Sequence, residues 1–548
     1  MRWRTRPALH TETLVLLAAL YLLAACNGPF WRAALAGREL SSPATWGFAL
    51  ALFGALAALY VGLACLVATR RTVRPLLAAL LLLGATLSFY IDRYAVYFDR
   101  NMLRNVLATQ WGEARELLGP GLLGHLLLWG VLPAALLWWP RLLPRRPLRA
   151  LAVRSAWIAG AAVVVVASLA PVFADFASVM RNHKEVRHLL TPGNVLAAAA
   201  GQAWGRAARP PGPLQPVGAD ARLEPGPPGR RPALFVLVVG ETARAANFSL
   251  DGYGRDTNPE LARRDIVNFS HATACGTSTE VSLPCMFSVY GRAGYDEAAI
   301  LSHESLLHVL NRAGIQVLWR DNQSGCKGVC DGLPVQQLDR AGVERVCPEG
   351  PCFDEVLLHG LDQVAADAHG NLFVVLHQLG SHGPSYYRRY PAAFRRFTPA
   401  CEQDELRRCS REEIVNAYDN SLLYTDHFLA RVIDFLQARQ DRFDTAMLYV
   451  SDHGESLGEA GLYLHGVPYA IAPSEQTRVP MLAWLSPGFA RSARLDLGCL
   501  RGRAGEPVSH DHLFHSLLGV LDVATSAYQP ERDLFRPCRT LKTAEIAP

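Results

Sequence analysis

Five long apolar stretches in the first third most constrain how this chain of 548 residues can fold. Each has about 17 residues or more, enough for a helix to cross the hydrocarbon core of a bilayer. A cleavable signal peptide would explain the arginines before the first stretch, but the four later stretches favour an uncleaved anchor. The sequence therefore predicts an α-helical membrane domain of five spans, at residues 13–30, 46–68, 75–91, 122–139 and 156–173.

Arginines in the short loops predict the orientation of these spans. They gather between the second and third stretches and between the fourth and fifth, whereas only Arg32 and Arg38 lie near the loop after the first. Cytoplasmic loops carry the excess of basic residues, so the N-terminus and both basic loops are expected in the cytoplasm. Five crossings then place everything after residue 174 outside. The basic residues concerned are Arg70, Arg71, Arg74, Arg141, Arg145, Arg146, Arg149 and Arg154.

Composition excludes one class of partner and points to a compartment. The arginine runs are not interleaved with aromatic residues as in a nucleic-acid groove, so no nucleic-acid partner is expected. Ten of the twelve cysteines follow residue 270, and eight of them form close pairs. Zinc ribbons are the alternative, but Cys-x2-Cys spacing is absent, and an even number outside the membrane fits disulfides in an oxidising compartment. The expected pairs are Cys275–Cys285, Cys326–Cys330, Cys347–Cys352, Cys401–Cys409 and, by elimination, Cys499–Cys538.

The pattern changes again after the membrane spans. Residues 195–208 are rich in alanine and predict a helix along the membrane surface, and residues 209–232 are a linker rich in proline and glycine. Strand patterns then alternate with helical ones, which favours an α/β domain with a largely parallel sheet. Strands are expected at 233–239, 314–319, 372–376, 445–450 and 479–484, and a capping box at Ser410 and Glu413 opens a helix that reaches Arg439.

These features divide the chain into three parts. Residues 1–175 form the membrane domain, with an external loop at 92–119; residues 176–232 form the juxtamembrane helix and linker; residues 233–548 form the outer domain. In the external loop, Asn105, Thr109 and Glu113 follow one another at helical spacing. This spacing fits either a solvated helix face or a polar strip that handles a lipid head group at the membrane surface.

Charged residues follow two of the expected strands. Asp452 and His453 come directly after the apolar run 447–450, and Glu241 follows the strand at 234–239. Strand ends in open α/β sheets line the crevice where ligands bind, and Asp and His supply oxygen and nitrogen ligands suited to zinc. His465 could return to the same crevice. The alternative for Asp452 is a capping residue beside a surface histidine.

Further polar groups gather near other strand ends. The loop between Cys275 and Cys285 carries the hydroxyls of Thr277, Ser278 and Thr279, which fit helix caps or a nucleophile facing a phosphate site. His377 and His382 follow the strand at 372–376, where two histidines favour a metal or phosphate role beside a structural one. Lys327, between Cys326 and Cys330, is a candidate contact for a phosphate oxygen.

Five blocks in order resemble the inner-membrane phosphoethanolamine transferases, the family of lipid A enzymes that includes the mobile colistin-resistance enzymes. The blocks are VVGETARAANFSLDGYGRDTNP, CGTSTEVSLPCMFS, WRDNQSGCKGVCD, HQLGSHGPSYYRRYP and YVSDHGESLGEAGLYLHG. The resemblance covers nearly the whole chain. It implies a periplasmic α/β domain of the alkaline phosphatase/sulfatase-like type behind five inner-membrane spans.

The resemblance also implies roles for individual residues. Zinc ligands match Glu241, Thr279, Asp452 and His453, with Thr279 as the nucleophile; one zinc ion is expected, with room for a second. His382 and His465 match residues that hold the substrate phosphate or that second metal. Gln323 stands where some members have Asn, which affects only fine placement of substrate. The remaining substrate-binding positions are Ser324, Lys327, His377, Glu455, Asn105, Thr109 and Glu113.

The implied reaction transfers phosphoethanolamine from phosphatidylethanolamine to a lipid A phosphate through a phosphoethanolamine-threonine intermediate. The product carries less negative surface charge, which favours polymyxin resistance. A monomer surrounded by membrane lipids is expected. The alternatives are transfer to a core heptose or another periplasmic glycan, and a related phosphoglycerol transferase or hydrolase. A sulfatase is disfavoured because Cys285-Met286-Phe287-Ser288 lacks the Cys-x-Pro-x-Arg setting, and a catalytically dead scaffold because every candidate ligand is present.

Overall fold

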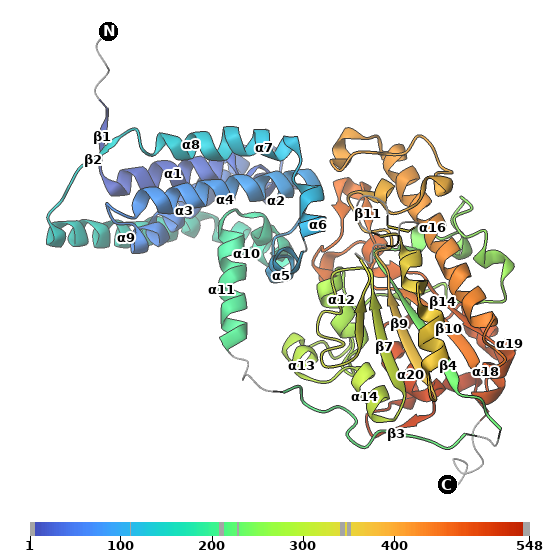
Figure 1. Ribbon diagram of the computed structural model, residues 1–548. Coiled ribbons are helices and arrows are strands. Elements are labelled where there is room, and N and C mark those ends of the chain that lie inside the picture. The colour runs from blue at the N-terminus through green and yellow to red at the C-terminus, as the bar shows by residue number, and fades with distance from the viewer. Residues whose placement is uncertain are drawn as a thin grey trace. The chain divides into compact units, whose positions relative to one another are not determined.

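The computed structural model describes residues 6–109, 111–207, 213–226, 229–339, 343, 346–347 and 352–540. The chain divides into two compact units, Met1–Leu103 with Leu118–Trp204, and Arg104–Leu117 with Gly205–Pro548. The segment Arg104–Leu117 thus packs with the C-terminal unit, although in the sequence it lies between two predicted membrane spans. Figure 1 shows both units.

The N-terminal unit is helical and leaves many apolar side chains exposed, among them Leu148 at 83% and Val166 at 68%. Such side chains fit a lipid environment, where a helix also satisfies its own backbone polar groups. A π-helical turn, Leu127–Val131, joins α7 to α8. The helices are α1 (Thr11–Ala25), α2 (Gly28–Ala34), α3 (Pro43–Val67), α4 (Val73–Tyr94), α7 (Pro120–Leu126), α8 (Leu132–Leu136), α9 (Pro147–Leu169), α10 (Phe173–Asn182) and α11 (Gly193–Ala207).

Three or four helices among the described residues are long and apolar enough to cross a membrane, against the five expected. Three of them begin at Pro43, Val73 and Pro147, and the fourth is the pair α1 and α2, bent by 66°. Asn27 lies at this bend, and its side chain donates to the carbonyls of Leu22 and Thr191 at 2.8 and 2.9 Å. The expected span at 122–139 corresponds to Pro120–Leu136, a shorter apolar helix. The first expected span is therefore broken rather than straight.

One end of this unit gathers the N-terminus and both basic loops. Strand β1 (Ala8–Leu9) pairs with β2 (Arg141–Leu142), and Arg145 pairs with Glu12 at 2.5 Å. From the other basic loop, Arg74 donates to the carbonyl of Pro140 at 2.6 Å. The arrangement is the one that the predicted orientation requires, because all three segments must lie on the same side of the membrane.

The C-terminal unit is built on a seven-stranded sheet in the order β5-β14-β10-β4-β9-β7-β8. The central β4 pairs in parallel with β10 and β9, and β7 pairs in parallel with β9 and β8. Its residues are all buried, as expected for a strand covered on both faces. The strands are β4 (Ala233–Gly240), β5 (Val267–Asn268), β7 (Gln316–Asp321), β8 (Val335–Gln337), β9 (Leu372–His377), β10 (Asp444–Ser451) and β14 (Met481–Leu485).

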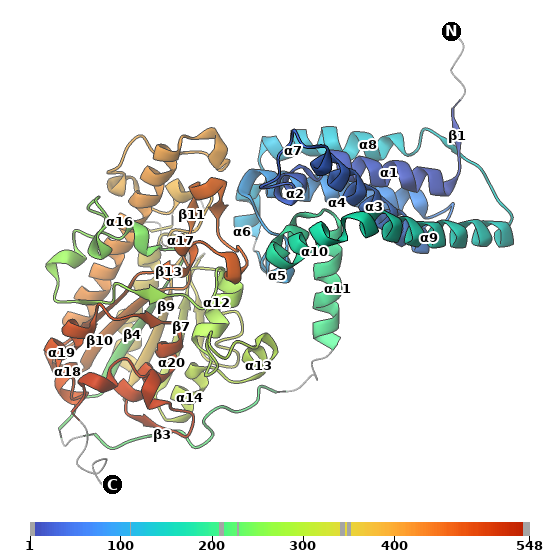
Figure 2. The ribbon, with the colours of Figure 1, turned by 180° about the vertical axis from the view of Figure 1, so that it is seen from behind.

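Alternate residues of β4 face two separate cores. Phe235 and Leu237 pack with α12 (Thr279–Met286), α14 (Leu306–Arg312) and α20 (Asp511–Val520), whereas Val236 and Val238 pack with α16 (Arg411–Gln437). The sheet therefore lies between two helical layers, which Figures 1 and 2 show from opposite sides. The alternation follows from the two-residue period of a strand.

One expected strand was wrong in extent and direction. Residues 479–484 form two strands, β13 (Arg478–Val479) and β14, separated by Pro480, which cannot donate to a ladder. Strand β14 then runs antiparallel to β10. The other four expected strands form within two residues of their expected bounds. The expected capping box is confirmed at the start of α16, where Ser410 Oγ accepts from the backbone of Glu413.

The remaining elements of the C-terminal unit are short. They are α5 (Arg100–Ala108, which begins in the N-terminal unit), α6 (Trp111–Ala114), α13 (Glu297–Ser302), α15 (Leu361–Asp367), α17 (Ser474–Thr477), α18 (Pro487–Ser492), α19 (Leu497–Arg503), β3 (Arg222–Leu223), β6 (Ala272–Thr273), β11 (Ser456–Leu457), β12 (Tyr463–Leu464), β15 (Val508–Ser509) and β16 (Val523–Ala524). Five disulfides join the same pairs that the spacing predicts: Cys275–Cys285, Cys326–Cys330, Cys347–Cys352, Cys401–Cys409 and Cys499–Cys538.

Candidate active site

Charged residues stand at the carboxyl ends of four neighbouring strands. Glu241 follows β4, and Asp452 and His453 follow β10. Strand β9 ends in His377, and β7 ends in Asp321. Because these four strands run parallel, their carboxyl ends meet at one edge of the sheet. The sequence signal of a charged residue after a strand therefore finds one common site.

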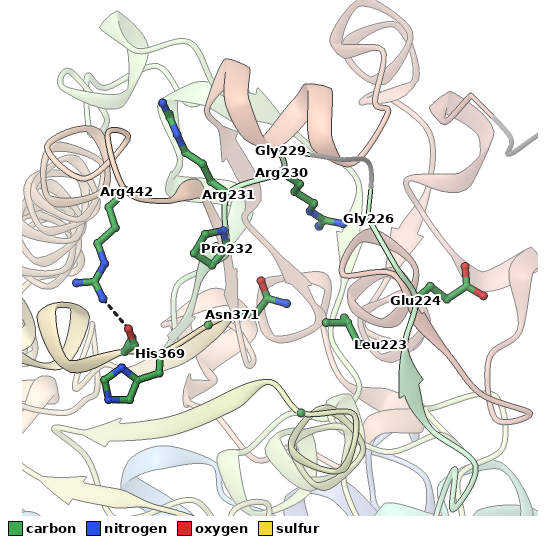
Figure 3. Close-up of a pocket in the computed structure, with 13 residues that line it drawn as sticks. Leu223, Glu224, Gly226, Gly229, Arg230, Arg231, Pro232, His369, Asn371 and Arg442 are labelled. Carbon is green, nitrogen blue, oxygen red and sulfur yellow. Dashed lines mark hydrogen bonds between the residues drawn. The ribbon is translucent and has the colours of Figure 1, made fainter.

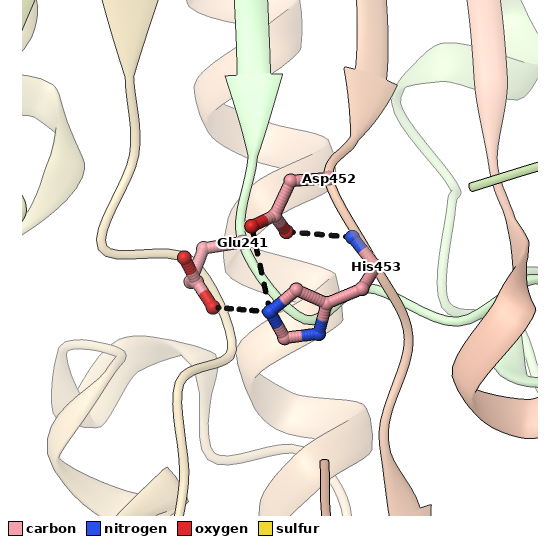
Figure 4. Close-up of side chains that lie close together, drawn as sticks. All are labelled: Glu241, Asp452 and His453. Carbon is pink, nitrogen blue, oxygen red and sulfur yellow. Dashed lines mark hydrogen bonds and ion pairs between the residues drawn. The ribbon is translucent and has the colours of Figure 1, made fainter. Parts of the chain in front are cut away.

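Glu241, Asp452 and His453 form a buried cluster in which three ligand atoms lie within 4.8 Å of one another. The Nε2 atom of His453 lies 3.4 Å from Glu241 Oε1 and 3.4 Å from Asp452 Oδ2, as Figure 4 shows. Within the described parts of the chain, these two carboxylate oxygens have no hydrogen-bond partner. Buried oxygens of this kind are costly unless a cation completes them.

His453 is oriented by its neighbours. Its Nδ1 lies 2.9 Å from the carbonyl oxygen of Gly454, which can only accept, so Nδ1 carries the hydrogen. Nε2 then faces the two carboxylates and can bind a metal once it has lost its proton. The His453 backbone N–H also donates to Asp452 Oδ1 at 2.7 Å. A ring whose second nitrogen is fixed by a carbonyl is the usual arrangement of a metal-binding histidine.

The charges of the cluster fit a divalent metal. Burial and, after it, the nearby charge of Glu241 together raise the pKa of Asp452 to about 6. Burial alone would lower the pKa of His453, but Asp452 and Glu241 raise it to about 10. The two carboxylates therefore attract a positive charge into a buried space. One nitrogen and two or more oxygens form a donor set that suits zinc.

Thr279 completes this cluster from the first turn of α12. Its Oγ1 donates to Glu241 Oε2 at 3.0 Å and lies 3.3 Å from His453 Nε2. The Cys275–Cys285 disulfide encloses the loop, and Thr277 Oγ1 donates to the carbonyl of Val467 at 2.7 Å. Of the three hydroxyls expected here, Thr279 is the one that contacts the cluster.

A polar chain leads from the cluster to Lys327. Gln323 Nε2 donates to Glu241 Oε2 at 2.8 Å, and its neighbour Ser324 accepts from Lys327 Nζ at 2.7 Å. Lys327 has a φ of 52° within the turn closed by the Cys326–Cys330 disulfide. These three expected substrate-pocket residues therefore lie together beside the cluster.

Two further histidines lie close to the cluster. The ring of His465 is centred 4.5 Å from that of His453 and 5.6 Å from that of His382. Glu455 Oε2 pairs with His465 Nδ1 at 2.9 Å, and its Oε1 accepts from Tyr386 at 2.7 Å. Burial lowers the pKa of His382 to about 3, so its ring is neutral near pH 7. A neutral imidazole can accept a proton or bind a metal.

His377 differs from His382 and His465 because its side chain is fully buried. Its Nδ1 lies 2.9 Å from Asp321 Oδ2, which also accepts from Trp319 Nε1 at 2.7 Å. Asp321 Oδ1 accepts from the backbone of Gln323 at 2.8 Å. His377 therefore contacts Asp321, which supports the Gln323 turn, and its expected contact with substrate stays a prediction.

The expected polar strip does not lie on one continuous helix. Helix α5 ends at Ala108 and α6 begins at Trp111, so Asn105 and Thr109 are not in helical register with position 113. Thr109 Oγ1 donates to the carbonyl of Asn105 at 2.7 Å. The side chain of Glu113 lies outside the described residues.

Three acidic residues near the site escaped the sequence reasoning. Asp321 ends a strand and could have been found by the rule that found Glu241. Asp354 accepts from the backbone of Leu379 and Gly380 at 2.8 and 3.0 Å and so fixes the turn before His382. Glu116 pairs with Arg389 at 2.6 Å. Neither Asp354 nor Glu116 follows a strand, so no sequence signal marks them.

Arg389 connects Glu116 to the site. The exposed fractions of the Arg389 and Glu116 side chains are 1% and 2%. The Nε atom of Arg389 donates to the carbonyl of His382 at 2.7 Å. A residue from the segment Arg104–Leu117 is therefore connected, through one arginine, to the backbone of a candidate substrate residue.

A cavity of about 820 Å³ lies at the opposite edge of the sheet, shown in Figure 3. It is lined by residues that precede the strands, among them Pro232 before β4 and Asn371 before β9. Its arginines are already paired: Arg230 with Asp522 at 2.6 Å, and Arg442 with the carbonyls of Ala366 and Ala368 at 2.8 and 2.6 Å. The cavity therefore offers space without free polar groups of the kind that the cluster has.

Comparison with known proteins gives consistent matches along the chain. Residues 55–204 match the family described as "Phosphoethanolamine transferase EptA/EptB", and residues 233–523 match the Sulfatase family. Phosphoethanolamine transferase EptA of Salmonella typhimurium is 43% identical over 85% of this chain and 86% of its own. Phosphatidylethanolamine transferase Mcr-2 of Escherichia coli is 36% identical over 94% and 96%. The integral membrane protein lipooligosaccharide phosphoethanolamine transferase A of Neisseria meningitidis has a TM-score of 0.92 at 36% identity, covering 97% of this chain and all of its own.

Proposed function

The chain belongs to the EptA family of phosphoethanolamine transferases, and from this premise we propose that it carries phosphoethanolamine from phosphatidylethanolamine to a lipid A phosphate on Thr279. It is an inner-membrane protein with its catalytic domain in the periplasm. Addition of phosphoethanolamine brings an ammonium to an anionic lipid. The product therefore binds cationic polymyxins less strongly, which favours resistance.

The main observation in support of this proposal is the contact of Thr279 with the buried cluster. Its hydroxyl donates to Glu241 at 3.0 Å, and His453 Nε2 lies 3.3 Å away. A hydroxyl is a weak nucleophile until a neighbour takes or polarises its proton. Both neighbours are buried with it, so water competes little for these contacts. Thr279 is therefore the residue most suited to attack phosphorus.

The proposed reaction has two displacement steps at phosphorus. Thr279 Oγ1 attacks the phosphorus of phosphatidylethanolamine, the bond from phosphorus to the diacylglycerol oxygen breaks, and diacylglycerol leaves with a proton. A lipid A phosphate oxygen then attacks the phosphoethanolamine on Thr279, and the threonine oxygen leaves and regains its proton. In both steps positioning and charge neutralisation lower the barrier, because the phosphoryl group needs little covalent help.

The proposed zinc site consists of Glu241, Asp452, His453 and Thr279. The unpartnered oxygens of Glu241 and Asp452, and the His453 Nε2 that faces them, support it. When bound there, zinc lowers the pKa of the threonine hydroxyl and neutralises charge on the phosphoryl group. Gln323 orients Glu241 by donating to its Oε2. A second metal, if bound, would use His382 and His465.

Lys327, His382 and His465 are proposed to contact the substrate phosphate. Lys327 supplies a compact positive charge held by Ser324, and the two rings supply donors or acceptors on the other side of the cluster. Asn105 and Thr109 are proposed to contact the donor lipid head group. We propose five membrane crossings, because the apolar helix Pro120–Leu136 is nearly long enough to span the bilayer. The proposed domains are the membrane domain at 1–175 and the catalytic domain at 233–548.

Intact-mass analysis of the full-length protein tests this function. Incubation with phosphatidylethanolamine should release diacylglycerol and add one phosphoethanolamine to the peptide that contains Thr279. Thr279→Ala should lose both signals, while its melting temperature in chelator stays that of the metal-free wild type. A variant with near wild-type diacylglycerol release would rule out Thr279 as the nucleophile.

Lipid A from cells that express the wild type identifies the acceptor. Mass spectrometry should find the added phosphoethanolamine on lipid A itself. Addition to a core heptose alone would replace lipid A by another periplasmic acceptor and leave the first half of the reaction intact.

A further inference from the structure

Glu280 directly follows Thr279 in the first turn of α12, and its carboxylate faces Lys327. Lys327 Nζ lies 2.8 Å from Glu280 Oε1, and their side chains are 9% and 17% exposed. The two atoms are close but not aligned as a hydrogen bond, so Glu280 Oε1 has no hydrogen-bond donor among the residues that the structure describes. A cation that also donates a hydrogen bond would satisfy this oxygen better.

Contacts on both sides hold this ion pair beside the cluster. Lys327 donates to Ser324, and the adjacent Gln323 donates to Glu241. On the other side, the backbone carbonyl of Glu280 accepts from Arg104 at 3.1 Å. The pair is therefore tied at one end to the proposed metal site and at the other to the start of the nucleophile's helix.

The charges of this small group balance. Arg104 pairs with Glu297, which leaves Lys327 and Glu280 to neutralise each other. Neither partner can leave without exposing the other as a nearly buried, unpaired charge, which is strongly unfavourable. A ligand that replaces the pair must therefore bring both a negative and a positive charge.

The transferred group of the proposed function has both charges, a phosphate and a primary ammonium two carbons away. We infer that Glu280 binds this ammonium while Lys327 binds the phosphate, so that the substrate replaces the internal ion pair. One ion pair then becomes two, and no charge is left unpaired. The ammonium of Lys327, which Glu280 faces at 2.8 Å, belongs to the same chemical class as the ammonium that it is inferred to bind.

This exchange makes Glu280 a specificity-determining residue. A glycerol phosphate head group would engage Lys327 but supply no cation for Glu280, which would be left as a nearly buried carboxylate without a partner. Rejection by an unpaired buried group is stronger than rejection by a poor fit. The inference rests on the proposed function, because it names the part of the same site that recognises ethanolamine.

Competition by soluble head groups tests the inference. The full-length protein in detergent releases diacylglycerol from phosphatidylethanolamine, and the inhibition constants of O-phosphoethanolamine and glycerol 3-phosphate are compared. In the wild type, O-phosphoethanolamine should inhibit more strongly. Glu280→Gln should reduce that preference about tenfold, the effect of one hydrogen bond to a charged group. Glu280→Asp should retain part of the preference for O-phosphoethanolamine. Glu297→Gln removes the same charge from the neighbouring ion pair and should leave that preference unchanged.

The ratio of the two inhibition constants is measured on one sample, so it does not depend on the fraction of the variant that is folded. An unchanged ratio in Glu280→Gln would overturn the inference and leave Glu280 as a structural partner of Lys327. A wild type that releases no diacylglycerol from phosphatidylethanolamine would overturn the proposed function itself, and this inference with it.

Discussion

The two ends of the strands in the central sheet differ in whether their buried charged side chains have partners. The carboxyl ends hold the candidate site, and the amino ends lie at what is called here the opposite edge. At the carboxyl ends of the strands, Glu241 and Asp452 each keep a buried oxygen that has no partner in the described chain. At the opposite edge, Asp522 pairs with Arg230, Arg494 and Arg539 at 2.6, 2.9 and 2.6 Å. Both ends hold buried charges, but in the described chain the oxygens of Asp522 are paired, whereas one oxygen of Glu241 and one of Asp452 are not.

This difference separates structural charge from functional charge. The opposite edge, where Asp522 is fully paired, is called the saturated edge. A cavity of about 820 Å³ lies there, yet its arginines already have partners. An unsatisfied buried carboxylate raises the free energy of the folded protein until a cation or substrate binds. Two unpartnered carboxylate oxygens that face one histidine nitrogen therefore mark the site better than cavity volume does.

Asp452→Asn should give the largest effect on activity. Loss of one proposed metal ligand should lower kcat by about a thousandfold or more, since charge stabilisation at such a site contributes at least as much as one oxyanion donor. The metal-free variant should be at least as stable as the metal-free wild type, because one of two mutually repelling buried carboxylates is gone. Diacylglycerol release, metal analysis and thermal melting in chelator measure the three quantities.

The comparison is supported if activity falls while the stability of the metal-free protein does not. A metal-free Asp452→Asn protein that melts well below the metal-free wild type would show that Asp452 is a structural charge like Asp522. Retained activity would remove it from the proposed metal site.

Asp321→Asn should lower activity by about ten- to a hundredfold, the range for residues that orient metal ligands. The Asp321 carboxylate accepts from His377 and Trp319 on one oxygen and from the backbone of Gln323 on the other. An amide can accept on only one side, so one of these contacts must break. Diacylglycerol release at saturating donor lipid checks the loss.

Asp444→Asn is the matched control because Asp444 begins β10 at the other edge of the sheet and is also buried. It should keep its activity. Equal losses in the two variants would mean that any buried aspartate of the sheet matters equally, and the contrast between the edges would fail.

Asp321 also shows how much of the site a sequence can predict. A charged residue directly after an apolar run predicts a position at the carboxyl edge of a parallel sheet, and this found Glu241, Asp452 and His453. It applies equally to Asp321. The rule works because local periodicity sets where a strand ends, and parallel strands share an edge.

Contacts between distant segments could not be predicted in this way. Glu116 and Arg389 are 273 positions apart, and neither follows a strand. The bend at Asn27 depends on its hydrogen bonds to Thr191, which tertiary structure supplies, so an uninterrupted helix was expected there. Pro480 is the exception, because its missing N–H was visible in the sequence and should have divided the expected strand at 479–484.

Glu116→Gln should lower kcat/KM about tenfold and leave metal content unchanged, as loss of one charge-assisted pair at a positioning residue predicts. The change leaves the buried Arg389 without its carboxylate, and Arg389 holds the carbonyl of His382. Kinetics with phosphatidylethanolamine and metal analysis check this. The double variant Glu116→Leu/Arg389→Met removes both charges and should recover thermal stability. Recovery of full activity as well would exclude a positioning role for Arg389.

Asp522→Asn should have the smallest effect on activity and a clear effect on stability. Three arginines would lose a fully charged partner, and breaking a buried ion-pair network of this kind costs about 3–5 kcal/mol. Asp522 lies at the saturated edge, so kcat and KM for phosphatidylethanolamine should stay at wild-type values below the melting transition.

The pH dependence of this difference tests its electrostatic origin. Burial raises the pKa of Asp522, but Arg539 and Arg230 outweigh that effect and lower it below the ordinary 3.8. A lowered native pKa means that the carboxylate stabilises the folded protein above about pH 4, and that this contribution is lost as the pH falls toward the native value. The melting temperatures of wild type and Asp522→Asn should therefore differ at pH 7 and converge in acid. If the difference in melting temperature persists in acid, the lost stability comes from packing rather than from charge. The contrast between paired charges at the saturated edge and unpaired charges at the catalytic edge would then fail.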